Sequence, residues 1–250
     1  MSGHSKWHNI RLRKGKQDAV RSKLFTKIAR EIIVAAKEGG GNLDSNLRLK
    51  LAVQKARENS MPADNIKRAI QRGTGEVEGA SYEETSYEGY GPAGVAVLVS
   101  CLTDNRNRTV AELRSIFSKC GGNLGESGCV AWMFEQTGLI QIPGDKADED
   151  TVMVATVDAG AEDIRIEGDT IDVLCRPADL PQVRDAVAAA GIEYSSAEVT
   201  MLPKSTVEIE DSKEANQILR LLDALDDNDD VQQVYANFDI PDELMQEAAA

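Results

Sequence analysis

The sequence is poor in the residues that enzymes most often use for catalysis and metal binding. Only two histidines, His4 and His8, occur among the 250 residues, so few residues are available for a catalytic Ser/His or Cys/His pair. The four cysteines form no C-x-x-C pair, a pattern typical of small buried apolar side chains in a reducing compartment. No G-x-S-x-G, H-E-x-x-H or Walker sequence occurs. The sequence therefore predicts a protein that is not an enzyme and that holds no cofactor and no metal.

Aromatic residues and long hydrophobic runs are also scarce. Aromatics make up 4% of the chain, so its cores must be built from aliphatic side chains. The longest nearly unbroken apolar stretch covers residues 94–102, about half of the roughly 20 residues that a membrane-spanning helix needs. The basic N-terminus lacks the apolar segment of a secretory signal. We therefore expect a cytoplasmic protein that has no membrane partner.

Charge is distributed very unevenly along the chain, although the formal net charge is −14. Residues 1–75 hold 17 Lys and Arg against 6 Asp and Glu, a net of +11, whereas residues 76–250 have a net of −25. We call residues 1–75 the basic head and residues 76–250 the acidic body. The head attracts a polyanion through counterion release, while the body repels it. The pattern favours nucleic acid as the partner of the head and leaves the body to orient it or to contact a protein. A random drift of solvated charge is the alternative.

Helical periodicity predicts that this head consists of three helices, over residues 17–37, 42–59 and about 62–73. In the first of them, Leu24, Ile28 and Ile32 fall on one apolar arc. Cations share the opposite arc, where they form a stripe suited to phosphate contacts. The members of this stripe are Lys16, Lys23, Lys27, Arg30 and Lys37.

After an acidic, loop-like stretch over residues 76–88, strand and helix patterns alternate. Residues 139–202 read β-α-β-β-α-β, the order of a ferredoxin-like unit. Residues 95–135, which end in a predicted strand over 129–135, and residues 206–238 each read β-α-β and together make the halves of a second unit. We therefore predict an α+β protein in which an N-terminal helical domain precedes two ferredoxin-like α/β domains, the third inserted into the second. The predicted domains are 1–78, 79–137 plus 204–250, and 138–203.

Two motifs resemble ligand sites but lack the context that such sites need. Residues 89–94 satisfy G-x-G-x-x-G, yet an acidic loop is predicted before them and a strand after them, which favours a turn with positive φ. Asp226, Asn228 and Asp230 match the start of a calcium loop, but Val231 replaces its glycine and Asn237 its glutamate. We interpret this second motif as a solvated helix end and turn.

Two basic segments remain as candidate contacts with nucleic acid. In residues 2–16, cations alternate with a tryptophan and two imidazoles, which suits phosphate contact and base stacking. The alternative is a basic tail that is disordered or packed on the helices. The candidate contacts in this segment are Lys6, Trp7, Arg11, Arg13, Lys14 and Lys16.

The second segment, residues 103–109, lies between a predicted strand and a predicted helix. An Asp or Asn in it can cap that helix. Arg106 and Arg108 have planar guanidinium groups that can form bidentate hydrogen bonds with a phosphate or a carboxylate. Because the surrounding domain is acidic, pairing of both arginines with neighbouring carboxylates is the alternative.

Several motifs resemble those of a known family and occur in the same order. They are Gly-His-Ser-Lys-Trp at 3–7, Phe-Thr-Lys at 25–27, three glycines at 39–41, Tyr-Glu-Gly-Tyr-Gly-Pro at 87–92, Asp-Asn-Arg-Asn-Arg-Thr at 104–109 and Ser-Lys-Cys-Gly-Gly-Asn-Leu-Gly at 118–125. Along essentially its whole length the chain resembles the YebC/PmpR family, which includes mitochondrial translational activators. Ala93 stands where that family usually has glycine. Since the first motif begins at residue 3, a mitochondrial presequence has no room, and we expect a bacterial member.

The resemblance implies three domains, one helical and two α/β, with no defined catalytic residues. It also implies a DNA-binding transcriptional regulator, or a ribosome-associated factor that helps translation through stretches such as consecutive prolines. The partner is thus duplex DNA in one reading and ribosomal or transfer RNA in the other. No residue of the sequence distinguishes the two, and a protein-interaction scaffold is a third, weaker hypothesis.

Overall fold

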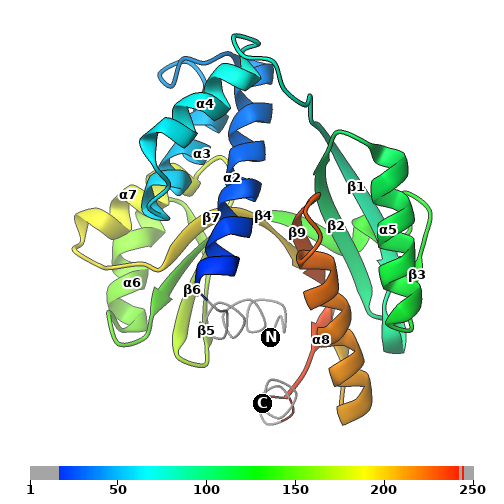
Figure 1. Cartoon of the computed structure of the whole chain (residues 1–250). Coiled ribbons are helices and arrows are strands. Elements are labelled where there is room, and N and C mark those ends of the chain that lie inside the picture. Colours follow the sequence, from blue (N-terminus) through cyan, green and yellow to red (C-terminus); the bar gives the residue numbers. More distant parts are fainter. Residues whose placement is uncertain (1–16, 242–243, 245–250) are drawn as a thin grey trace. The chain divides into compact units, whose positions relative to one another are not determined.

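A computed structural model describes residues 17–241 and residue 244 of the chain (Figure 1). The described residues form two compact units. Trp132–Thr206 make up one unit, and the residues before and after this segment make up the other. Along the chain, the 132–206 unit is therefore an insertion into the larger one. The division into three domains, with a separate helical domain over 1–78, stays a prediction.

The larger unit begins with the three helices that periodicity predicts. Their shared core contains Ile28 and Ile32 from the first helix, Leu49 from the second and Ile66 from the third. Asn46 caps the second helix by accepting the backbone N–H of Leu49 at 3.0 Å. The helices are α2 (Gln17–Gly39), α3 (Leu47–Glu58) and α4 (Ala63–Gly73).

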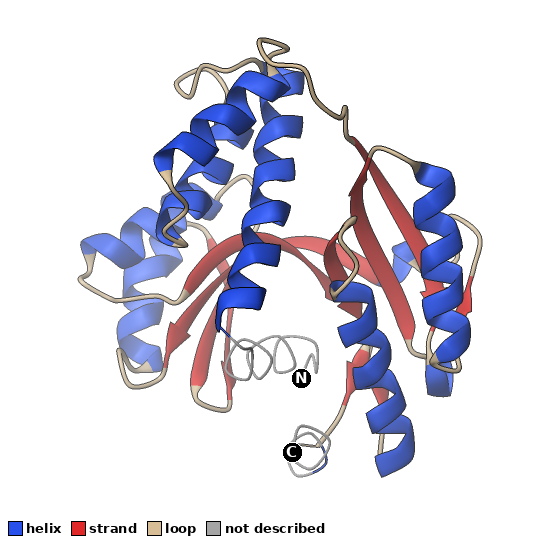
Figure 2. Ribbon diagram, in the orientation of Figure 1, coloured by secondary structure: helices blue, strands red, loops and turns tan. Residues whose placement is uncertain are grey.

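An antiparallel sheet with two helices follows in the same unit. Its strand order is β3-β1-β2-β9, and helices α5 and α8 lie against it (Figure 2). The sheet and the two helices share a core that includes Phe117 and Leu222. The strands are β1 (Glu83–Tyr90), β2 (Ala96–Thr103), β3 (Asn123–Leu124) and β9 (Val231–Ala236), and the helices are α5 (Arg106–Lys119) and α8 (Ser212–Asp226). Two short strands, β8 (Val207–Glu208) and β10 (Phe238–Asp239), pair in parallel beside it.

The 132–206 unit has the predicted β-α-β-β-α-β order. Its four strands are antiparallel throughout and lie in the order β5-β6-β4-β7, which is the ferredoxin-like arrangement. The elements are β4 (Phe134–Pro143), α6 (Glu149–Thr156), η3 (Val157–Ala159), β5 (Ala161–Glu167), β6 (Thr170–Cys175), α7 (Leu180–Ala189) and β7 (Ser196–Pro203). The mixed α+β class predicted from the sequence is confirmed.

The strand assignment of the larger sheet needs two corrections. The predicted acidic loop over 76–88 is wrong in its second half, because β1 begins at Glu83 and pairs with β2 over its full length. The predicted strand over 129–135 is also wrong, because η2 (Ala131–Met133) precedes β4 there. In this sheet β1 lies between β2 and β3, whereas β8, at the predicted strand over 206–209, pairs with β10 outside it.

The glycine-rich segment after β1 is the tight turn of a β-hairpin. Ala93 and Gly94 have φ values of +54° and +76°, and the Gly91 N–H donates to the Val95 carbonyl at 2.8 Å. The predicted positive-φ turn is therefore confirmed, although a strand rather than a loop precedes it. None of the helices among the described residues is both long and apolar enough to span a bilayer.

Candidate functional site

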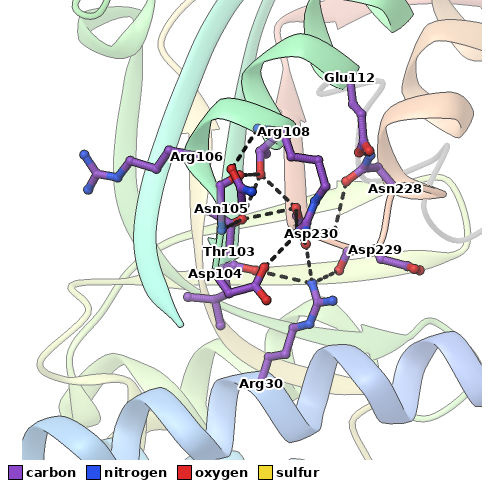
Figure 3. Close-up of polar contacts among 12 residues, drawn as sticks. Arg30, Thr103, Asp104, Asn105, Arg106, Arg108, Glu112, Asn228, Asp229 and Asp230 are labelled. Atoms are coloured by element: carbon purple, nitrogen blue, oxygen red, sulfur yellow. Dashed lines mark hydrogen bonds and ion pairs between the residues drawn. The ribbon is translucent and has the colours of Figure 1, made fainter. Parts of the chain in front are cut away.

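The carboxylate of Asp230, just before β9, is the centre of an ion cluster within the larger unit (Figure 3). The residue is 2% exposed. Arg30 of α2 donates to this carboxylate at 2.9 Å, and Arg108 of α5 donates to its two oxygens at 3.0 and 2.7 Å. The hydroxyls of Thr103 and Thr109 donate at 3.2 and 2.8 Å. One buried carboxylate thus joins α2 to the β2–α5 connection.

The electrostatics of this cluster favour full ionisation. Burial alone would raise the pKa of Asp230, but the hydrogen bonds from Arg108 and Thr109 and the charge of Arg30 hold it below its usual range. Hydrogen bonds to Asp230 and Asp104 raise the pKa of Arg108. The cluster is therefore a set of charge-assisted hydrogen bonds around the Asp230 carboxylate.

The sequence around the start of α5 explains how Arg108 reaches this position. Asn105 caps the helix, since its side chain accepts the Arg108 backbone N–H at 3.1 Å. The Asn105 N–H in turn donates to the Thr103 hydroxyl at 2.9 Å. Arg108 also pairs with Asp104 at 2.8 Å, and this second contact holds its guanidinium toward Asp230.

Three cations of α2 contact residues 226–230, here named the acidic turn. Lys23 pairs with Asp227 at 3.0 Å and Lys27 pairs with Asp226 at 2.6 Å, while Arg30 pairs with Asp230 as described. The Lys27 and Arg30 side chains are only 15% and 12% exposed. These cations therefore form a row of ion pairs along one side of α2.

Arg30 has the most contacts in this row. Besides Asp230, its Nη1 donates to the carbonyl oxygens of Leu102, at 3.3 Å, and of Asp229. Its guanidinium also lies 5.0 Å from the centre of the Tyr82 ring, a cation–π contact. Because Nη1 has three acceptors and the guanidinium lies against an aromatic ring, Arg30 is part of the folded framework.

The other predicted contacts with nucleic acid lie elsewhere or outside the described residues. Lys37 donates to the Ser81 hydroxyl at 2.7 Å, and Arg106 pairs with Glu83 at 3.0 Å. Both arginines of the 103–109 segment thus contact neighbouring carboxylates, which was the alternative interpretation. The predicted contacts Lys6, Trp7, Arg11, Arg13, Lys14 and Lys16 lie outside the described residues.

The role of Asp230 was not predicted from the sequence. The predicted solvated helix end and turn before β9 is wrong for Asp230, which is buried. The available signal was that Asp230 directly precedes the apolar residue Val231, which begins the predicted final strand. In the structure Val231 is buried, whereas Asp227 and Asp229 are exposed. The roles of Thr103 and Thr109 as donors to this carboxylate were not predicted either.

A cavity of about 550 Å³ lies beside the ion cluster. Its charged lining has three cations but five carboxylates, so it repels a phosphate rather than attracting one. Among residues 17–241, no group of three or more His, Cys, Asp or Glu side chains is arranged to hold a metal ion. The charged lining residues of the cavity are Lys23, Arg30, Arg108, Asp104, Glu112, Asp227, Asp229 and Asp230.

A second buried carboxylate, that of Glu88 in β1, organises the loop after β3. It accepts the backbone N–H groups of Gly128, Val130 and Ala131, each at 2.7 Å. Burial would raise the pKa of Glu88, but these three donors hold it below its usual range. The function of this glutamate is to close the loop onto the sheet.

The comparisons with known proteins agree with this mixed α/β architecture. A family model described as the TACO1/YebC protein N-terminal domain matches residues 5–76. A second model, described as the TACO1/YebC second and third domain, matches residues 82–238. The chain therefore belongs to the TACO1/YebC family, as its motifs predict.

Similar proteins cover nearly the whole chain. A probable transcriptional regulatory protein of Desulforapulum autotrophicum is 57% identical over 244 residues, which are 98% of each chain. Another protein with this description, from Persephonella marina, is 54% identical over the full length of both chains. The crystal structure of a conserved hypothetical protein from Aquifex aeolicus matches with a TM-score of 0.84 and 46% identity, covering 92% of this chain and 95% of that one. The names of the two relatives agree with the regulatory role predicted from the sequence.

Proposed function

We propose that this protein is a non-enzymatic regulator of gene expression that acts in the cytoplasm by binding nucleic acid. The observation that carries the proposal is the concentration of 17 Lys and Arg against 6 Asp and Glu in residues 1–75. Phosphates bind such a surface because condensed counterions are released. The names of the relatives, which describe probable transcriptional regulators, support duplex DNA as the target.

Ribosomal or transfer RNA is the second candidate target. Lys and Arg side chains contact phosphates, and they therefore fix position and read shape rather than base sequence. The stripe of cations predicted on α2 has no Asn or Gln at its positions to read an adenine edge. Because a structured RNA presents phosphates in a defined shape, the same basic head suits a translation factor.

Equilibrium binding of the full chain to three partners tests the proposal. The partners are promoter DNA, a random duplex of equal length and purified ribosomes, all in about 0.15 M salt. We expect binding to at least one of them, with an affinity that falls steeply as salt rises. A preference for promoter DNA of about a thousandfold over random duplex supports the transcriptional role, and ribosome binding without it supports the translational one. Binding to none of the three contradicts the proposal and favours a protein-interaction scaffold.

A further inference from the structure

The N-terminal helices carry a second basic surface, on the outer side of α3 and α4. We propose that this surface, rather than α2, makes the phosphate contacts of the described helices. The inference rests on the proposed function and names the side chains that perform it. We call the surface the α3–α4 basic face, and its members are Lys50, Arg57, Lys67, Arg68 and Arg72.

The pairing of α2 with the acidic turn makes α2 a poor phosphate site. Lys27 and Arg30 are largely buried, and each of them already faces a carboxylate within hydrogen-bond distance. A phosphate that approached them would be repelled by the negative charges of Asp226, Asp229 and Asp230, which lie beside them. To bind it, α2 would have to break ion pairs that are part of the fold.

The α3–α4 basic face has the opposite properties. All five of its residues are exposed, and none of their side chains has a hydrogen bond or ion pair within the part of the chain that the structure describes. Only two acidic residues, Glu58 and Asp64, occur in α3 and α4, and the amide of Gln54 donates to Glu58 at 2.9 Å. The five residues of the α3–α4 basic face are therefore an excess of cations that no carboxylate of the described chain neutralises.

Helix geometry places the α3 members on one flank. Lys50 and Arg57 are seven residues apart, which is nearly two turns, so they lie on the same side about 10 Å apart along the axis. Arg48 and Lys55, on the opposite flank, pair with glutamates of α2 and β1. The flank with Lys50 and Arg57 therefore faces away from α2. Their spacing lets the two side chains reach different phosphates, because successive phosphates of one strand are about 3.4 Å apart along the duplex axis.

On α4 the three cations lie on the exposed side of the helix. Ile66 and Ala69 are buried in the helical core, and Lys67, Arg68 and Arg72 point away from it. Arg68 and Arg72 are one turn apart and neighbours on the helix surface. Only four residues, 59–62, connect α3 to α4, and both helices pack against α2 (Figure 1). The sugar–phosphate backbone of a nucleic acid is the partner that this arrangement of unpaired cations fits.

Charge-removal variants of the full chain test the assignment through the salt dependence of binding. The probes are a random DNA duplex and a structured RNA, measured over a series of salt concentrations. The two test variants are Lys50→Gln/Arg57→Gln and Lys67→Gln/Arg68→Gln. Each should flatten the slope of log affinity against log salt by up to about 1.8 on duplex, since each phosphate contact contributes about 0.9. The matched control is Lys213→Gln/Arg220→Gln, which removes two exposed cations from α8 and should leave the slope unchanged.

The outcomes separate this inference from the proposed function. If the unmodified chain binds neither probe, the proposed function fails and the inference fails with it. If it binds but both test variants keep its slope, only the inference is wrong. The variant Lys23→Gln/Lys27→Gln adds a further check, because flattening there instead would assign the phosphate contacts to α2. Thermal melting by circular dichroism shows that each variant is folded, and Lys50→Arg/Lys67→Arg should retain the original slope.

Discussion

Asp230 is a single carboxylate on which three parts of the larger unit depend, namely α2, the start of α5 and the acidic turn. Replacing it with asparagine removes the charge but keeps the size, so Arg30 is left inside the fold without its anion. Removing one partner of a buried pair costs about 3–5 kcal/mol. We expect Asp230→Asn to lower the free energy of unfolding by about 3 kcal/mol, measured by urea denaturation. Asp229→Asn is the matched control at an exposed site and should change it by less than about 0.5 kcal/mol. Equal effects of the two substitutions would contradict this role.

The lowered pKa of Asp230 also predicts a pH dependence of stability. Because its pKa in the folded chain lies below the unfolded value of about 3.9, the ionised form stabilises the fold. This contribution is complete above the unfolded pKa and is lost as the pH falls through the folded pKa. We expect the free energy of unfolding to fall below about pH 4, and the fall to be shallower in Asp230→Asn. A variant that follows the same pH profile as the unmodified chain would show that other groups cause the acid sensitivity.

Glu88 is a second buried carboxylate whose replacement should lower stability, although only backbone N–H groups donate to it. A glutamine there offers one acceptor oxygen and an NH₂ group that faces donors, so at least one of the three backbone N–H groups loses its partner. Hydrogen bonds to a charged group contribute about 1.5–3 kcal/mol each. We expect Glu88→Gln to lower the free energy of unfolding by about 3 kcal/mol, measured by thermal denaturation. It should also speed amide hydrogen exchange at Gly128, Val130 and Ala131. Glu126→Gln, at an exposed site in the same loop, should do neither.

Among the secondary-structure elements, the turn between β1 and β2 contains a strained residue. Ala93 has a φ of +54°, a left-handed conformation that costs a non-glycine residue about 1–2 kcal/mol. Glycine removes this strain but gains freedom in the unfolded chain, which offsets roughly half of the benefit. We expect Ala93→Gly to raise the free energy of unfolding by up to about 1 kcal/mol, measured by denaturant melts. The same change at Ala190, exposed and at ordinary φ, should lower it instead.

Helices could be predicted from the sequence because their burial follows a local period. Ile28 and Ile32 recur at helical spacing and are buried in the structure, so the pattern and the packing agree. β1 could not be predicted in this way, because Glu83 and Glu84 at its start are exposed and the strand forms by pairing with β2 and β3. Contacts between distant parts of the chain also explain why Asp230 is buried, since its partners Arg30 and Arg108 lie 200 and 122 residues away in the sequence. Charge sign was readable from the sequence, but which cations face solvent was not.

At the scale of the whole molecule, the opposite charges of head and body serve two purposes. Part of the positive charge is neutralised within the fold, where α2 meets the acidic turn. The α3–α4 basic face, whose five cations belong to no described ion pair, attracts a polyanion in the proposed function, while residues 76–250, with 36 Asp and Glu against 11 Lys and Arg, repel it. If the proposed function holds, the direction of binding follows from the excess charge that is left after internal pairing. The formal net charge of −14 alone would predict no affinity for nucleic acid.

Repulsion by the body can be measured by removing carboxylates far in sequence from the head. Asp145, Asp158 and Asp169 of the 132–206 unit are exposed and belong to no described ion pair, so their replacement with asparagine should hardly affect folding. The Debye length is about 30 Å at 0.01 M salt but about 8 Å at 0.15 M. We therefore expect the triple variant to bind duplex DNA several-fold more tightly near 0.01 M salt and no more tightly at 0.15 M. The matched control, with glutamate at the three positions, keeps the charge and should bind like the unmodified chain. An equal gain at both salt concentrations would mean that these aspartates lie within contact distance of the nucleic acid, and no gain at either would mean that the body has no electrostatic part in binding.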